Sequence, residues 1–223
     1  MNNSFEKQAG IALIIFTVLL VGTIVLHPAG GNIEHLVKAR NFTLVSHSIA
    51  LLSLPFGGIG LWGITRSIGT GHFGSLFGFA LAVLALIAAL LAGTINGLAL
   101  PIFLQQYQET TTENIAMFKL VARYGFALNH AFDYIYTCAL GLAILCWSLS
   151  ILHTRKLPVR IGWLGIIVFL AVGAFFLYGI RINNLSGLRL YISSIIGWIL
   201  VSGIALCKSR YPGTSNDETR PAV

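Results

Sequence analysis

The sequence predicts an all-α polytopic membrane protein, a bundle of about six transmembrane helices with no sizeable soluble domain. Of its 223 residues, 56% are hydrophobic and only 9% are charged, whereas a soluble domain carries roughly 25% charged residues. The apolar residues also form long continuous runs of about 20 residues, the length that a helix needs to cross a bilayer. Because lipid offers the backbone no hydrogen-bond partners, each run is expected to be a helix.

Six apolar runs follow one another along the chain. They cover Ala9–Leu26, Phe42–Ile64, Phe73–Leu100, Tyr124–Leu152, Ile161–Tyr178 and Leu190–Cys207. The first run is followed by His27-Pro28-Ala29-Gly30-Gly31, a poor cleavage site, so we expect a retained span and not a signal peptide. Pro55 inside the second run predicts a kink, because proline removes a helical hydrogen bond. Asn114–Arg123 predicts an amphipathic helical extension before the fourth run.

These boundaries divide the chain into one transmembrane domain, residues 1–207, and a polar, disordered cytoplasmic tail, residues 208–223. The net charge of +7 does not indicate nucleic-acid binding, because the basic residues are scattered among the connections. Arg155, Lys156 and Arg160 crowd the connection before the fifth run, which favours a cytoplasmic position for that connection and for both termini. The three cysteines lie in or at the end of apolar runs without CxxC spacing, so neither a disulfide framework nor a cysteine zinc site is expected.

Polar side chains are predicted to gather at one depth, the non-cytoplasmic end of the bundle. At the helical rise per residue, His47, Asn96 and His130 lie about 28 to 36 Å from the cytoplasmic ends of their runs. The hydrocarbon slab is about 30 Å thick. Arg181 belongs to the connection at the same end, and His27 is interpreted as an interfacial residue.

The fourth run adds a polar face to this level. Its residues Lys119, Arg123, Ala127, His130 and Tyr134 follow three- and four-residue steps and are predicted to share one side of a helix. Asp133 adjoins them, and a carboxylate beside an imidazole occurs both in metal sites and in general-base pairs. The competing interpretation is a structural pair, or a contact of Asp133 with Arg123 or Arg181 that holds helices together.

The candidate ligand-binding residues are therefore His47, Asn96, Arg123, His130, Asp133, Tyr134 and Arg181. Among them, His47, His130 and Asp133 are candidate ligands of a divalent metal, because two imidazoles and a carboxylate suit zinc or iron with one position left open.

The chain resembles the uncharacterised bacterial six-helix membrane proteins that are grouped as domains of unknown function. The resemblance lies in His27-Pro28-Ala29-Gly30 after the first run, in His47 near the start of the second, and in Leu157–Gly165, which carries a proline followed by Gly162-Trp163. It implies a six-helix bundle in a bacterial cytoplasmic membrane, and it implies no activity.

Three functions remain open on the sequence alone. The first is a polar pocket, formed by His47, Asn96, His130 and Asp133, that binds a metal, a lipid or a quinone-like molecule. The second is a b-type haem protein with His47 and His130 as axial ligands. The third is an accessory subunit that packs against a partner membrane subunit through small residues. Those small residues are Gly22, Gly57, Gly58, Gly60, Gly141 and Gly173.

Overall fold

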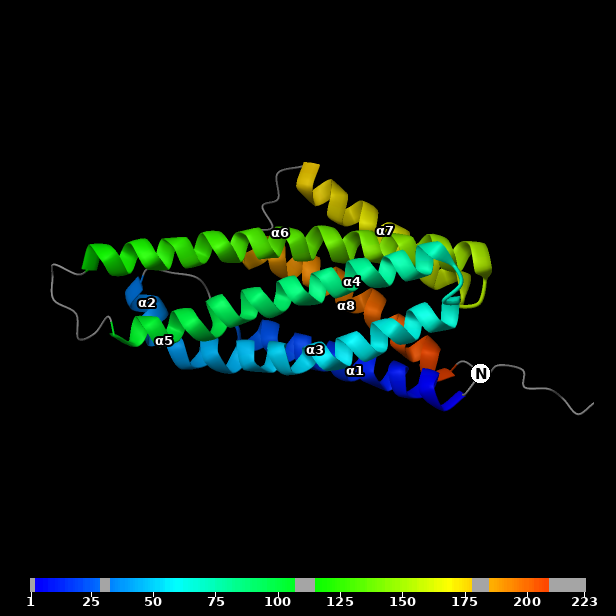
Figure 1. Ribbon diagram of the computed structural model, residues 1–223, viewed down its shortest axis with the longest axis horizontal. Coiled ribbons are helices and arrows are strands. Elements are labelled where there is room, and N and C mark those ends of the chain that lie inside the picture. The colour runs from blue at the N-terminus through cyan, green and yellow to red at the C-terminus, as the bar shows by residue number, and fades with distance from the viewer. Residues whose placement is uncertain (1–2, 29–32, 107–114, 178–184, 209–223) are drawn as a thin grey trace, which may run out of the picture.

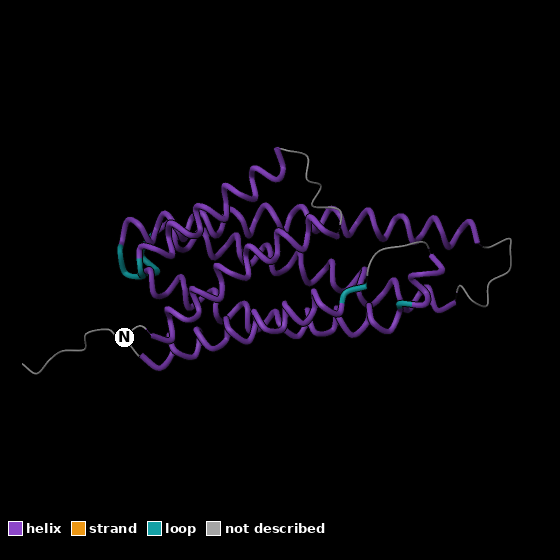
Figure 2. Tube along the Cα trace, turned by 180° about the vertical axis from the view of Figure 1, so that it is seen from behind, coloured by secondary structure: helices purple, strands orange, loops and turns teal. Residues whose placement is uncertain are grey.

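A computed structural model describes residues 3–28, 33–106, 115–177 and 185–208 of the chain. The helices are α1 (Asn3–Leu26), α2 (Ile33–Lys38), α3 (Arg40–Ile68), α4 (Phe73–Ala92), the π-helix η1 (Gly93–Ala99), α5 (Leu100–Gln105), α6 (Ile115–Thr154), α7 (Val159–Leu177) and α8 (Leu185–Lys208). The long helices lie side by side along the long axis of the molecule, and α7 diverges from α6 (Figures 1 and 2). These ranges contain no strand, which confirms the predicted all-α bundle.

Five of the described helices are long and apolar enough to cross a membrane, so the chain is a multi-pass membrane protein. They are Ser4–Leu26, Arg40–Ile68, Phe73–Gln105, Ile115–Thr154 and Tyr191–Lys208. The predicted fifth run corresponds to α7, a 19-residue helix whose described apolar stretch, Val159–Ala174, is shorter than the other five. The structure therefore supports five spans, and the sixth stays a prediction.

Three local features differ from, or add to, the sequence expectations. The helix α3 continues through Pro55 to Ile68. The third span passes through η1 and Pro101 and ends at Gln105, beyond its predicted end. The predicted extension before the fourth run is helical from Ile115. In it, Phe118 is buried and Lys119 is exposed. The short helix α2 was not predicted, and the tail after Lys208 lies outside the described residues.

Close packing of α1 against α3 depends on glycine. A Cβ atom at Gly63 would overlap the Cβ of Ala9, and one at Gly60 would overlap the side chain of Leu13. Helices in lipid associate mainly through such close van der Waals contact, because lipid tails are as apolar as the side chains. A Cβ atom at Gly57 would lie 3.0 Å from the Phe16 ring, so Gly57 and Gly60 are used for packing inside the chain and are not exposed for a partner subunit.

Buried hydrogen bonds join further helices near the end of the bundle where α1 begins. Trp147 on α6 donates from Nε1 to Thr65 Oγ1 on α3 at 2.9 Å, and Ser75 on α4 donates to the Thr65 carbonyl at 3.0 Å. Trp198 on α8 donates from Nε1 to the carbonyl of Ile161 on α7 at 3.1 Å. In an apolar medium an unmade hydrogen bond is costly, so these bonds restrict how the helices pack.

The Gly63→Ala substitution should lower the free energy of unfolding by about 1 to 3 kcal/mol, because the new methyl group overpacks the contact with Ala9. Thermal unfolding of the detergent-solubilised protein measures the effect. The matched control is Gly22→Ala, since no described atom lies within 4 Å of that added Cβ. The control should be neutral or slightly stabilising, because alanine favours helix over glycine. Equal losses for both variants would contradict the proposed role of Gly63.

Candidate functional site

The antiparallel packing of α1 and α3 brings two histidines together at the end of the bundle opposite the start of α1. Phe16 lies against Gly57 midway along the pair. At the far end, the rings of His27 and His47 lie 5.0 Å apart between centroids, with their planes tilted by 55°. The sequence interpretation of His27 as an interfacial residue did not include this contact with the ring of His47.

Backbone carbonyls fix the protonation of both rings. The Nδ1 atom of His47 lies 2.9 Å from the Thr43 carbonyl oxygen, and the Nδ1 atom of His27 lies 2.9 Å from the Pro28 carbonyl oxygen. A carbonyl oxygen only accepts hydrogen bonds, so both Nδ1 atoms carry a proton. Two cationic rings at this spacing would repel each other. At least one of the two rings is therefore neutral, and a neutral His47 with its proton on Nδ1 has an Nε2 atom that accepts a hydrogen bond.

A π-helical segment packed against His47 carries the next polar residue of the site. In η1 the residue Gly97 lies so close to α3 that a Cβ atom there would overlap the His47 side chain. A Cβ atom at Gly93, one turn earlier, would lie 3.0 Å from the Leu51 side chain, so two glycines four residues apart form the contact with α3. Between them, η1 carries Asn96. Single π-helical turns inside α-helices often occur at functional sites.

The wider turn of η1 has a cause in the sequence. Pro101 has no backbone N–H, and its ring conflicts with the carbonyl four residues earlier, at Gly97. The helix continues because Leu100 donates its backbone N–H to the carbonyl of Ile95, five residues earlier. Proline thus shifts the hydrogen-bond pattern here instead of ending the span.

Asn96 and His130 complete this level of the bundle. The third span and α6 run antiparallel, as shown by Gly78 against Trp147 and Leu100 against Gly125. By the same register, Asn96 lies at the height of residues 129 and 130. Among the described residues, no hydrogen-bond partner is found for the buried Oδ1 of Asn96 or the buried Nδ1 of His130. We call His27, His47, Asn96 and His130 the polar layer.

The predicted pairing of His130 with Asp133 is not formed. Instead, Asn129 donates from Nδ2 to Asp133 Oδ2 at 2.8 Å. Residues four apart on a helix lie one above the other, which favours the Asn129–Asp133 pair. The Nδ1 atom of His130 is left without a described partner. Asp133 therefore lies next to the polar layer and accepts a hydrogen bond from the Asn129 amide. It does not orient the His130 imidazole.

The predicted polar face of α6 is mostly exposed. Lys119, Arg123 and Ala127 are exposed, and Tyr134 is 48% exposed, while His130 is half-buried. At the helical repeat these positions share one side of α6, but that side is not buried as a whole. Arg123 and Tyr134 are thus not gathered with His130, and Arg181 lies outside the described residues.

The described residues do not assemble the predicted metal ligands. Across residues 3–28, 33–106, 115–177 and 185–208, no group of three or more His, Cys, Asp or Glu side chains is placed to hold a metal ion. The set His47, His130 and Asp133 is therefore not a metal centre in this arrangement. Asp133 is engaged by Asn129, and His47 is held by the Thr43 carbonyl.

Apolar side chains cover the polar layer on both sides. The main core lies toward the end where α1 begins and includes Leu13, Leu61 and Ile144. Beyond the layer, a second cluster of buried residues joins α5 to α6. It contains Leu100, Leu104 and Ala122, packed with Val37, Phe103 and Phe126. The sequence interpretation placed the polar residues at the bundle's edge, whereas the helices and their packing continue past them.

Sequence reasoning missed His27, Asn129 and the π-helical geometry around Asn96. The pairing of His27 with His47 depends on the register of α1 against α3, and the glycines at positions 57, 60 and 63 carry the only sequence signal for it. Pro101 inside an apolar run is the signal for η1. Comparison of the chain with known protein families, curated proteins and solved structures found no match. The function must therefore be argued from the residues themselves.

Contact between the two rings predicts energetic coupling. The substitutions His27→Ala and His47→Ala should be non-additive by about 0.5 to 3 kcal/mol in the free energy of unfolding, as expected for side chains in contact. Reversible unfolding in mixed micelles measures the four states of the cycle. The control cycle combines His27→Ala with His153→Ala. His153 is in the last turn of α6, at the end of the bundle opposite to the two rings. That cycle should be additive, and additivity in the first cycle would contradict the His27–His47 contact.

Proposed function

We propose that this chain is a multi-pass protein of a bacterial cytoplasmic membrane that binds a small amphipathic ligand, of the quinol type, in its polar layer. The proposal rests on buried polar atoms that have no hydrogen-bond partner among the described residues. Asn96 Oδ1 and His130 Nδ1 have none among the described residues, and they share a level with His47, whose Nε2 atom can accept a hydrogen bond.

The energetics favour an occupant. A buried polar group without a hydrogen bond costs about 1 to 3 kcal/mol. A ligand with hydroxyl groups would recover that cost by donating to Asn96 Oδ1 and His47 Nε2. The π-helical turn that presents Asn96 also departs from regular α-helix, and such turns often occur at functional sites.

The chemistry of the site indicates the class of ligand. Its polar groups include the Asn96 amide and the His27–His47 pair, whose spacing disfavours two positive charges, so they suit a neutral hydroxyl. The apolar clusters on both sides suit an apolar body. A dihydroxy-aromatic head on an apolar tail meets both requirements, as does a lipid with a hydroxyl-bearing head group.

The purified full-length protein should bind ubiquinol-1, kept reduced under anaerobic conditions, more tightly than ubiquinone-1, because the site offers acceptors to the hydroxyl groups. The substitutions His47→Ala and Asn96→Leu should each weaken ubiquinol-1 binding about tenfold or more, as expected when a buried hydrogen bond is lost. Isothermal titration calorimetry measures the dissociation constants.

A glycine pair provides the matched control for this experiment. Gly97→Ala should abolish binding because the new methyl group would displace the His47 ring. Gly125→Ala should preserve binding, since its added Cβ meets Leu100 only at 3.8 Å. Unchanged ubiquinol-1 affinity in the His47 and Asn96 variants would refute the proposal. Iron or another metal bound to the wild type and lost in His47→Ala, with or without a haem absorption spectrum, would replace the quinol by a metal or haem.

The proposed orientation places both termini in the cytoplasm, which requires α7 to cross the membrane as the sixth span. Six cations belong to the end of the bundle where α1 begins and α8 ends: Lys7, Arg66, Arg155, Lys156, Arg160 and Lys208. Lysine and arginine near span ends favour the cytoplasmic side. The ends themselves lie together, because Cys207 Sγ is 3.7 Å from the carbonyl oxygen of Lys7.

A green fluorescent protein fused after Val223 should fluoresce in bacterial cells, because that reporter folds in the cytoplasm. Alkaline phosphatase inserted between Gln105 and Ile115 should be active, because that reporter needs the periplasm. The reverse pattern, with an inactive phosphatase and a dark fluorescent fusion, would show that the topology is inverted.

A further inference from the structure

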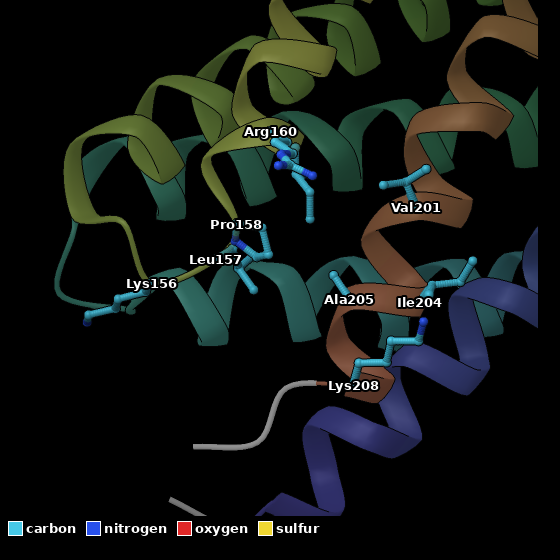
Figure 3. A pocket seen from close by; sticks show the side chains of 9 residues that line it. Lys156, Leu157, Pro158, Arg160, Val201, Ile204, Ala205 and Lys208 are labelled. Carbon is cyan, nitrogen blue, oxygen red and sulfur yellow. The ribbon is translucent and has the colours of Figure 1, made fainter. Parts of the chain in front are cut away.

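A groove with a volume of about 560 Å³ lies between the start of α7 and the end of α8 (Figure 3). It is at the opposite end of the bundle from the polar layer. Pro158 and Arg160 line it on the α7 side, and Val201, Ile204 and Lys208 line it on the α8 side. The groove therefore combines apolar and basic side chains at the place where two apolar helices end.

The charge of this groove is entirely positive. Arg160 and Lys208 lie on opposite walls, and none of the lining residues is acidic. A third lining cation, Lys156, contributes mainly its aliphatic stem: its Nζ atom lies 2.8 Å from where a Cβ at Gly69 would be, in the turn before α4. Figure 3 likewise shows Lys156 extending away from the other lining side chains. Arg160 and Lys208 are thus the cations available to an anionic ligand.

The apolar part of the groove is exposed along one helix and closed at its base. Val201 and Ile204 on α8 are 40% and 38% exposed. Leu157 and Ile161 form a buried base, at 4% and 2% exposed. The hydrogen bond from Trp198 to the Ile161 carbonyl, at 3.1 Å, fixes α8 against α7 just inside the groove. The packing of α8 against α7 therefore shapes the groove.

We infer that this groove is a binding site for an anionic phospholipid, with the phosphate between Arg160 and Lys208 and an acyl chain along Val201 and Ile204. Charge complementarity selects an anionic head group, and basic grooves between transmembrane helices bind such head groups. Because α7 begins at Val159, its first turn has backbone N–H groups without partners within the helix, which add to the attraction for a phosphate, although that of Ile161 donates to the Pro158 carbonyl at 2.9 Å. This inference does not depend on the proposed function, which concerns the other end of the bundle.

Lipid-dependent thermal stability tests the inference. The full chain, purified in a neutral detergent, should gain thermal stability on titration with palmitoyl-oleoyl phosphatidylglycerol, because a ligand that binds the folded state stabilises it. The matched phosphatidylcholine should give little gain. The double variant Arg160→Gln/Lys208→Gln should need roughly tenfold or more lipid for half of the effect, since each cation near a membrane surface contributes substantially to anionic lipid binding.

Three controls separate this site from general electrostatic attraction. Lys7→Gln removes an exposed cation at the same end of the bundle and outside the groove, and it should titrate like the wild type. The charge-preserving double variant Arg160→Lys/Lys208→Arg should retain the effect, which excludes a mere folding defect. Inorganic phosphate should not reproduce the stabilisation, because it has no acyl chain for the apolar wall.

Several results would overturn the inference. Equal stabilisation by phosphatidylcholine would indicate a general lipid effect. A loss in Lys7→Gln as large as in the double variant would indicate attraction to the whole basic end. Stabilisation by inorganic phosphate alone would indicate a simple anion site, and an unchanged titration in Arg160→Gln/Lys208→Gln would exclude the groove altogether.

Discussion

The contact of α1 with α3 is the constraint on which the polar layer depends. Within a bilayer the hydrophobic effect does not drive one helix onto another, so close approach of the backbones must supply much of the attraction. Gly60 and Gly63 permit that approach by leaving room for Leu13 and Ala9. They also fix how far the helices are shifted along each other. The same register that seats Leu13 brings His27 to His47 at the far end.

The third span combines a similar glycine contact with a change in helical geometry. Gly93 and Gly97 allow η1 to lie close to α3, as Gly60 and Gly63 allow α1 to lie close to α3. Pro101 alters the backbone hydrogen bonds in this stretch. The wider turn carries Asn96, next in sequence to the glycine that packs on His47. Small residues and one proline therefore determine where polar side chains lie in a chain composed mainly of apolar ones.

The sequence predicted the fold class and most helix boundaries, because continuous apolarity and the needs of a backbone in lipid leave few alternatives. It also predicted that His47, Asn96 and His130 lie at similar depth, since depth follows from counting residues along helices. It could not predict which side chains touch. The pairing of His130 with Asp133 failed because rotation about the helix axis, and competition from Asn129, are decided by packing between helices. Arg123 and Tyr134 are exposed and lie outside the layer.

The length of α6 has a consequence for access to the polar layer. Its 40 residues extend about 60 Å at the helical rise, roughly twice the hydrocarbon thickness. The helix therefore continues well past His130, where Phe118 stacks on Phe103 of α5 with ring centroids 4.7 Å apart. A molecule moving along the bundle axis from that end would have to part these rings, whereas one already dissolved among the acyl chains could enter sideways between helices. Occupancy of the layer would then follow the partitioning of a ligand into the bilayer and not its concentration in water.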